Sequence, residues 1–390
     1  MHRLALLLIL AATPLRADGL SQWLAEFRPR AEAAGIAPDV LDRALGDLDY
    51  LDDVIRLDRN QSEFTKPIWD YLDGAVSAFR IRNGRAALDR HAATFDAIEA
   101  RWGVEREVVA AIWGLESSYG AVRGDTPTLS ALATLATDGR RGAFFEAQLL
   151  AALRIVQAGD IAAAGMRGSW AGAMGHTQFM PTSFLDHAVD LTGDGRRDIW
   201  GDDPADALAS TAAYLAFHGW TTGQPWGVEV VLPDGFDYAQ AAATITKAPG
   251  DWTALGVRTA AGAPLPGDAP VAIRLPAGAQ GAAFATYPNF EVLERYNTAD
   301  AYVIAAGHLA DRLAGGPPLR AGWPRGDRAL TFGERVEMQR LLAAKGFDPQ
   351  KLDGLVGPLT LAAIRGWQGS VGLVPDGYMP PRLLERLRGD

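Results

Sequence analysis

Apolar residues recur at intervals of three and four over most of the N-terminal half of this 390-residue chain. The pattern starts at Leu20, Trp23 and Phe27 and continues in alanine-rich segments. This period places apolar side chains on one face of a helix, so this half is predicted to be mainly helical. The period is lost in a glycine-rich stretch over 160–204 and in short β-like runs between Pro/Gly turns over 226–287. We therefore expect a mainly α fold with a short β-containing segment.

The first residues, 1–17, are predicted to be a signal peptide. Arg3 supplies a positive charge, an apolar run of about nine residues follows, and the small Ala17 suits a cleavage site. The run is too short for a membrane-spanning helix, which takes about 20 residues. A buried first helix is the alternative. The sequence thus predicts a soluble, exported protein with no membrane anchor.

The C-terminal residues are predicted to form a separate small domain. Residues 315–327 lack an apolar period and are dense in Gly and Pro, so we interpret them as a linker. The unit that follows contains a weak repeat, in which Asp-Gly turns at Asp353 and Asp376 each precede a proline suited to a helix N-terminus. The predicted division is a signal peptide over 1–17, a large domain over 18–314, a linker over 315–327 and a small domain over 328–390.

Composition excludes several classes of protein. Cysteine is absent, which excludes disulfides, thiolate zinc sites, a cysteine nucleophile and a lipidated N-terminal cysteine. The net charge of −10 argues against binding to nucleic acid. The six histidines lack the spacing of zinc hydrolases, and we interpret His176 as cleft-lining or structural rather than as a catalytic base.

Glu116 is the candidate catalytic residue. It lies at the end of the helical run REVVAAIWGLESSYG (106–120), four and three residues after Ile112 and Trp113, and so falls on the apolar face. A carboxyl group in that setting loses hydration when it ionises, which raises its pKa and lets it hold a proton near neutral pH. A general acid needs this property. The alternative is a glutamate that points to solvent at a frayed helix end.

A second motif, GSWAGAMGHTQFMP over 168–181, combines glycines with a few polar and apolar side chains. Glycine allows the backbone to approach a ligand closely. Ser169 and Gln178 offer hydrogen bonds, while Met174 and Phe179 offer apolar contact. This mixture suits a sugar, which has polar edges and apolar faces. A buried turn that packs against neighbouring helices is the alternative.

In this order along the chain, four motifs resemble the lytic murein transglycosylase B family: ESSYG at 116–120, SWAGAMGHTQFMPTSF at 169–184, DGRRDIW at 194–200 and PNFEVLERYN at 288–297. The resemblance extends from about residue 20 to 313. Residues 328–390 resemble the helical peptidoglycan-binding module that is often fused to exported wall enzymes. Together they imply a lysozyme-like transglycosylase domain with a small β-containing insertion, followed by a small three-helix peptidoglycan-binding domain.

The resemblance implies a peptidoglycan lytic transglycosylase located in the periplasm. Such enzymes cleave the β-1,4 bond between N-acetylmuramic acid and N-acetylglucosamine without water and leave 1,6-anhydromuramoyl ends. Glu116 matches the catalytic acid, and one carboxyl suffices because the substrate's own C6 hydroxyl is the nucleophile, whereas ordinary glycosidases use two. Peptidoglycan glycan strands are the expected partner. The residues expected to contact them are Tyr119, Ser169, Met174, Gln178, Phe179, Tyr296 and Asn297.

A loop that follows the second motif resembles the start of an EF-hand, and some members of the family bind a cation there. Its candidate metal ligands are Asp190, Thr192, Asp194 and Asp198. Gly201 occupies position twelve, where an EF-hand has a bidentate glutamate, so a plain Asx/Gly turn is the favoured interpretation. No cofactor is expected to be required, and calcium or sodium would bind only weakly.

Two other functions stay open at this point. A hydrolytic muramidase would use a second carboxylate, for which Asp125, Asp138, Glu146 and Asp186 are candidates. A non-catalytic peptidoglycan-binding scaffold is the other alternative, although an inactive protein has no reason to keep Glu116.

Overall fold

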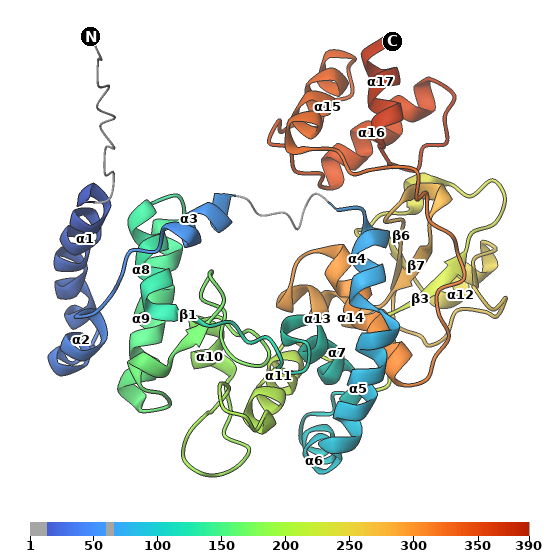
Figure 1. Ribbon diagram of the computed structural model, residues 1–390. Coiled ribbons are helices and arrows are strands. Elements are labelled where there is room, and N and C mark those ends of the chain that lie inside the picture. Colours follow the sequence, from blue (N-terminus) through green and yellow to red (C-terminus); the bar gives the residue numbers. More distant parts are fainter. Residues whose placement is uncertain (1–13, 60–65, 390) are drawn as a thin grey trace, which may run out of the picture. The chain divides into compact units, whose positions relative to one another are not determined.

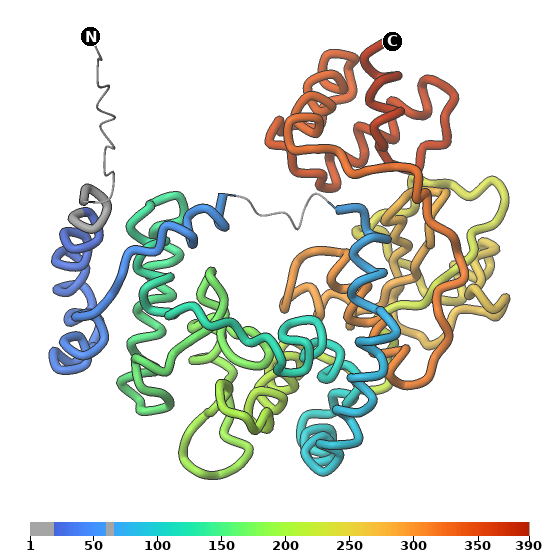
Figure 2. Tube along the Cα trace, viewed as in Figure 1, coloured from blue at the N-terminus to red at the C-terminus, as the bar shows by residue number. Residues whose placement is uncertain are grey.

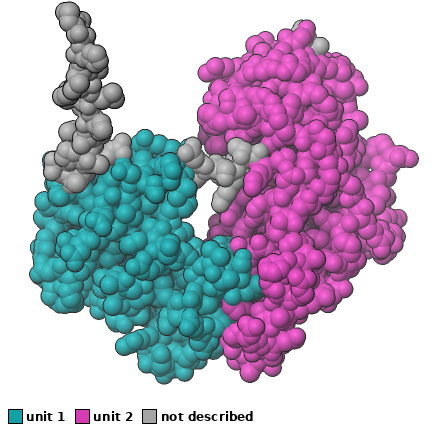
Figure 3. Space-filling view, viewed as in Figure 1, with its two compact units in different colours: residues 1–61, 116–213 teal, residues 62–115, 214–390 magenta. Residues whose placement is uncertain are grey.

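The computed structural model describes residues 14–59 and 66–389 (Figure 1). The chain divides into two compact units, one containing 116–213 with the N-terminal residues and the other containing 62–115 with residues 214 onward (Figure 3). In the part of the chain that is described, no helix is both long and apolar enough to cross a membrane. The predicted signal peptide lies outside the described residues, apart from its last four positions.

The first unit is built around helices α8 and α9, which pack against each other and are contacted by α1, α2, α3 and α10. The strands β1 and β2 pair antiparallel, with Thr126 opposite Gly168, and this pairing joins the segment after Glu116 to the start of the glycine-rich motif. The elements of this unit are α1 (Pro14–Ala33), α2 (Pro38–Leu45), α3 (Asp52–Arg59), β1 (Thr126–Pro127), α8 (Thr128–Asp138), α9 (Gly142–Ala158), β2 (Arg167–Gly168), α10 (Pro181–His187) and most of α11 (Ala205–Phe217).

The second unit contains a five-stranded antiparallel sheet with the order β4-β6-β7-β3-β5. Its core includes the fully buried Trp252, Val271 and Ile273. Helix α14 is buried along most of its length and contacts α4, α5 and α13. The elements before the C-terminal module are α4 (Ile68–Ala75), α5 (Ala78–Arg90), α6 (Ala92–Trp102), most of α7 (Arg106–Ser117), β3 (Gly227–Val231), β4 (Thr246–Lys247), α12 (Pro249–Ala254), β5 (Arg258–Thr259), β6 (Val271–Arg274), β7 (Ala283–Thr286), α13 (Pro288–Tyr296) and α14 (Asp300–Leu313). The predicted mainly α class with a short β-containing segment is confirmed.

The C-terminal module consists of three helices, α15 (Phe332–Ala344), α16 (Pro358–Ser370) and α17 (Pro381–Gly389), around a core that includes the buried Trp367. Its two Asp-Gly turns are held in the same way. The Oε1 atom of Gln339 accepts a hydrogen bond from the Gly354 amide at 2.8 Å, and that of Gln368 accepts one from the Gly377 amide at 2.9 Å. The internal repeat seen in the sequence therefore corresponds to two turns of similar construction.

Residues 315–327 follow the surface of the second unit, from the end of α14 to the small module (Figure 2). The carboxylate of Glu229 accepts hydrogen bonds from the amides of Arg320 and Ala321, at 2.8 and 2.6 Å. Arg325 forms an ion pair with Asp73 at 2.7 Å. These contacts fix a segment whose Gly/Pro content is typical of a linker.

The module is also bonded to the sheet region of the same unit. Asp376 of the second turn accepts a hydrogen bond from the Ala279 amide at 2.9 Å, and Arg365 donates one to the Ala241 carbonyl at 2.6 Å. A Cβ atom at Gly278 would overlap Asp376 and Tyr378, so only glycine permits this close approach.

Candidate active site

Helix α7 carries Glu116 in its last turn. The preceding residues from Val108 to Trp113 are buried, and their packing fixes the helix. Glu116 itself is half-buried. A carboxyl group at the end of a packed helix has a defined position, which a group that must deliver a proton requires.

The backbone turns sharply after Glu116. Ser118, Tyr119 and Gly120 have φ values of 53°, 60° and 83°, so three successive residues adopt the left-handed conformation. This conformation is uncommon for residues other than glycine and persists only where neighbouring contacts hold it. Tyr119, a predicted saccharide-contacting residue, lies in this turn and is half-buried.

Ser117 supplies the contacts that hold the turn. Its Oγ atom accepts a hydrogen bond from the Gly120 amide at 2.9 Å and donates one to the His176 carbonyl at 2.5 Å. Its own carbonyl accepts from the Val122 amide at 2.9 Å. The buried Ser117 therefore links the end of the Glu116 helix to the glycine-rich motif.

The motif itself folds as a tight turn that begins at Ser169. The Ser169 amide donates to the Ala173 carbonyl at 2.7 Å, and its Oγ atom accepts from the Ala173 amide at 3.1 Å. A Cβ atom at Gly168 would overlap the Ala173 carbonyl, and one at Gly124 would overlap the Gly168 carbonyl. Glycine is therefore required where the segment after Glu116 crosses the motif.

Met174 and Phe179 are placed differently from the sequence-based expectation. Their backbones pair across the motif by two hydrogen bonds of 2.8 and 3.0 Å, and their side chains are 0% and 3% exposed. Both side chains pack inside the motif in this structure, and their role as substrate-binding residues stays a prediction. They support the motif from inside, because apolar burial at this turn stabilises its conformation.

Gln178 lies between these two pieces of the site. It has a φ of 56°, and its Nε2 atom donates to the Arg123 carbonyl at 3.0 Å and to the Gly175 carbonyl at 2.8 Å. Both amide hydrogens are thus used within the protein. The Oε1 atom of this half-buried side chain is the one that can meet a ligand.

Arg123 is a further structural residue that the sequence analysis missed. Its Nη1 atom donates to the carbonyls of Trp200, at 3.0 Å, and Gly201, and its Nη2 atom pairs with Asp202 at 3.2 Å. His176 Nε2 lies 2.7 Å from the same Gly201 carbonyl, and burial lowers the pKa of His176. A neutral, buried His176 is structural, in agreement with its interpretation from the sequence.

The EF-hand-like loop bonds to itself. Asp190 accepts hydrogen bonds from the Gly193 and Gly195 amides at 2.6 and 2.8 Å, and Asp198 accepts one from the Trp200 amide at 2.9 Å. Over residues 14–59 and 66–389, no group of three or more His, Asp or Glu side chains is gathered as metal ligands. In this structure the oxygens of Asp190, Asp194 and Asp198 accept hydrogen bonds within Asx turns, and the weak metal-binding set of Asp190, Thr192, Asp194 and Asp198 stays a prediction.

Asp206 on α11 lies at the centre of this loop, a role that the sequence analysis did not predict. Its Oδ1 atom accepts from the amides of Leu191 and Thr192, at 2.9 and 3.2 Å, and its Oδ2 atom accepts from the Asp198 amide at 2.9 Å. The side chain is 2% exposed, and burial raises its pKa although these hydrogen bonds lower it. A single buried carboxylate thus organises the loop.

Calcium is expected to bind this loop more weakly than the micromolar range. The loop lacks the bidentate glutamate of an EF-hand, and its carboxylates already accept backbone hydrogen bonds. Isothermal titration of the metal-free protein with CaCl₂ measures this. A dissociation constant at or below the micromolar range would contradict the prediction.

Tyr296 and Asn297 belong to the second unit, at the C-terminal end of α13. The Tyr296 ring packs edge-on against that of Tyr214, with centroids 5.3 Å apart. Tyr214 in turn donates a hydrogen bond to the Arg295 carbonyl at 2.6 Å, and Asn297 accepts one from the Ala299 amide at 3.1 Å. Both predicted residues are therefore fixed by contacts within the second unit, and their role in substrate binding stays a prediction.

Comparison with known proteins identifies the family. Residues 19–311 match the family described as the Transglycosylase SLT domain, and residues 333–387 match a peptidoglycan binding domain family. The chain belongs to the SLT transglycosylase family. It is 31% identical over 299 residues to the membrane-bound lytic murein transglycosylase B of Escherichia coli K12, a match that covers 70% of this chain and 77% of that protein.

Solved structures agree with this assignment. SltB3 of Pseudomonas aeruginosa, determined in complex with NAG-anhNAM-pentapeptide, is 48% identical, with a TM-score of 0.92 over 95% of this chain and 99% of that one. The lytic transglycosylase Slt35 of Escherichia coli, determined in complex with calcium, is 28% identical, with a TM-score of 0.65 over 76% of this chain and 93% of that one. The chain is thus a lytic transglycosylase with a lysozyme-like fold and a C-terminal peptidoglycan-binding domain.

Proposed function

We propose that this SLT transglycosylase cleaves the β-1,4 bond between N-acetylmuramic acid and N-acetylglucosamine in peptidoglycan, with Glu116 as its single catalytic carboxyl. Glu116 protonates the leaving glycosidic oxygen. The ionised group then takes the proton from the C6 hydroxyl of the muramic acid as that oxygen attacks C1. The bond from C1 to the leaving oxygen breaks, the bond from C1 to O6 forms, and a 1,6-anhydro end results.

The observation that carries this proposal is the setting of Glu116. The side chain follows a packed helix and precedes a turn that Ser117 bonds to the glycine-rich motif. Ser169 and Gln178 in that motif are half-buried, so part of each side chain is accessible to a saccharide. We place Ser169, Gln178 and Tyr119 on the sugar, and we propose Tyr296 and Asn297 as further substrate-binding residues.

The hydrolytic alternative requires a second carboxylate, and two of its four candidates are already engaged. Asp138 pairs with Arg59 at 2.8 Å, and Glu146 forms a two-bond pair with Arg30 at 2.8 and 3.0 Å. A carboxylate held by arginine is a weak base and a weak nucleophile. Asp125 and Asp186 are exposed and are the two left to test.

Product analysis distinguishes transglycosylation from hydrolysis. Sacculi digested in oxygen-18-labelled water are expected to yield disaccharide peptides with anhydro ends and no incorporated label, because water takes no part. Mass spectrometry of the soluble products measures this. Labelled reducing ends as the main product would show a muramidase instead and would direct attention to Asp125 and Asp186.

We place the protein in the periplasm, where its substrate is. The proposed signal peptide over 1–17 and the C-terminal peptidoglycan-binding domain both support this location. Fractionation of cells that express the full chain tests it. Recovery of the uncleaved chain from the cytoplasm alone would contradict it.

Removal of residues 328–390 is expected to weaken retention on sacculi while cleavage of soluble glycan fragments persists. The catalytic carboxyl lies in the other compact unit, whereas the module bonds to the sheet region through residues such as Asp376 and Arg365. Co-sedimentation with sacculi and turnover of soluble fragments measure the two effects separately. Loss of both would show that the module is needed for the folded enzyme.

A further inference from the structure

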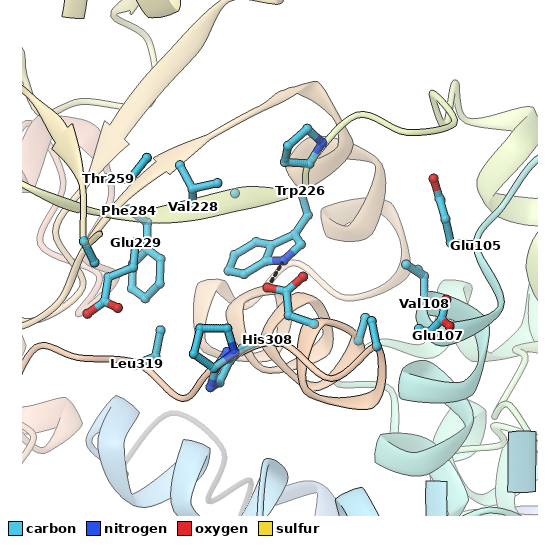
Figure 4. Close-up of a pocket in the computed structure, with 18 of the residues that line it drawn as sticks. Glu105, Glu107, Val108, Trp226, Val228, Glu229, Thr259, Phe284, His308 and Leu319 are labelled. Atoms are coloured by element: carbon cyan, nitrogen blue, oxygen red, sulfur yellow. Dashed lines mark hydrogen bonds between the residues drawn. The ribbon is translucent and has the colours of Figure 1, made fainter. Parts of the chain in front are cut away.

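A pocket of about 650 Å³ lies in the second unit, and none of its lining residues belongs to the proposed catalytic site (Figure 4). Strands β3 and β7, helix α14, the start of α7 and residues 316–320 surround it. Its walls are largely apolar, with Trp226, Val228, Phe284 and Leu319 among them. A cavity of this size and character is typical of small-molecule sites.

The charged side chains around the pocket are mostly acidic. Glu229 lies at one end and Glu105 and Glu107 at the other, with the Trp226 ring between them (Figure 4). Asp311 lies beside this ring. The one arginine in the lining is Arg320, whose Nη1 atom donates to the Ala260 carbonyl. The acidic excess favours a cationic ligand.

Several polar hydrogens in the lining are used within the protein. The indole of Trp226 donates to Asp311 Oδ2 at 3.0 Å. The Trp220 indole and the Gly223 amide donate to the two oxygens of Glu105 at 2.7 and 2.6 Å. These indole and amide groups are therefore not available as donors to a ligand.

Acceptors, in contrast, are in excess. Gln224 also lines the pocket, but its Oε1 atom is buried and does not face a ligand. Asp311 is exposed to the pocket, and only its Oδ2 atom is bonded to the Trp226 indole. Glu107 adds a further carboxylate to the lining.

The titration behaviour of the lining agrees with a shortage of positive charge. Desolvation by the surrounding protein raises the pKa of Asp311 to about 6, although the hydrogen bond from Trp226 lowers it. Burial, and then the charge of Arg312, lower the pKa of His308 to about 4. At pH 7 the carboxyl is thus mainly ionised, while the imidazole is neutral and does not compensate its charge.

We propose that this pocket binds a primary ammonium group carried on an apolar chain or ring. The ammonium supplies N–H donors for the lining carboxylates, of which Asp311 has an oxygen not used by Trp226, together with the positive charge that the lining lacks. The Trp220 ring adds a cation–π surface, and the apolar body lies against the accessible side chains of Val228 and Leu319. The site is separate from the glycan-cleaving chemistry and does not depend on it.

Titration calorimetry on the full-length chain at pH 7.5 tests this with n-hexylamine, hexanoate, hexanol and hexyltrimethylammonium. Hexylamine is expected to bind at least about tenfold more tightly than hexanoate or hexanol, because only it supplies both charge and donors. It should also bind more tightly than the trimethyl compound, which has no N–H group. If hexanol binds as tightly as hexylamine, the pocket recognises only the apolar chain. If the trimethyl compound binds more tightly than hexylamine, the pocket does not select a primary amine. Either result overturns the proposal.

Variants locate the ligand. Asp311→Asn keeps an acceptor for Trp226 but removes the charge, and we expect hexylamine affinity to fall at least about fivefold. Glu291→Gln on the exposed part of α13 removes the same charge outside the pocket and should leave affinity unchanged. If Asp311→Asn melts at a lower temperature than the unchanged protein, Glu107→Gln provides the same test of the lost charge. Unchanged affinity in a folded Asp311→Asn or in Glu107→Gln would overturn the assignment.

Discussion

The Glu116→Gln variant is expected to release soluble products from sacculi at least about a thousandfold more slowly than the unchanged protein. The substitution preserves the size of the side chain but leaves no proton to give to the glycosidic oxygen and no base to take one from the C6 hydroxyl. General acid–base groups contribute about 10²–10⁴-fold each, and here one group serves both steps. Quantitation of released anhydro-muropeptides by mass spectrometry measures the loss.

Two controls make this result specific. The Glu116→Gln variant should still sediment with sacculi, because the peptidoglycan-binding module is untouched. Asp125→Asn, which neutralises an exposed carboxylate of the same unit, should retain activity within about twofold if no second carboxylate takes part. Unchanged lysis by Glu116→Gln would move the chemistry to another residue.

The Asp206→Ala variant is expected to lower the free energy of unfolding of the first unit by about 3–5 kcal/mol. Asp206 is 2% exposed and accepts hydrogen bonds from the amides of Leu191, Thr192 and Asp198. Its removal leaves three donors without their acceptor, at about 1–3 kcal/mol for each one that stays buried. Urea unfolding followed by tryptophan fluorescence measures the change.

Asp203→Ala provides the matched control for this prediction. Asp203 lies three residues earlier, is exposed, and accepts one hydrogen bond from the Ala205 amide at 3.0 Å at the start of α11. Its loss is expected to cost about 1 kcal/mol, as for other helix-start acceptors. Equal effects of the two substitutions would show that Asp206 does not organise the loop.

Periodicity was sufficient to predict the elements, because an apolar face must be buried whatever its partner is. The run before Glu116 forms α7, and the β-like runs near Val228 and Val271 form β3 and β6. The same reasoning explains why periodicity does not show that Met174 and Phe179 are buried. A glycine-rich turn has no helical or strand periodicity to show which side chains face the protein core. An apolar side chain that packs into the core therefore cannot be distinguished, from the sequence, from one that contacts a ligand.

The polar residues that fix the site could not be predicted from their neighbours in the sequence. Arg123 bonds to carbonyls of residues 200 and 201, and Asp206 bonds to amides of a loop that begins 15 residues earlier. An arginine on a loop and an aspartate in the first turn of a helix are ordinary surface features by composition. Only the folded chain distinguishes these two from the many charged residues that face solvent.

The attachment of the C-terminal module bears on the engineering of chimeric wall enzymes. Residues 315–327 are rich in Gly and Pro, so a protein engineer would treat them as a spacer that can be lengthened, shortened or transferred together with the C-terminal module. Glu229 bonds to the Arg320 and Ala321 amides, and Asp376 bonds to the Ala279 amide. A module that is transplanted without the sheet region would therefore lose the partners of these hydrogen bonds. A functional graft therefore has to carry the sheet region along with the three helices.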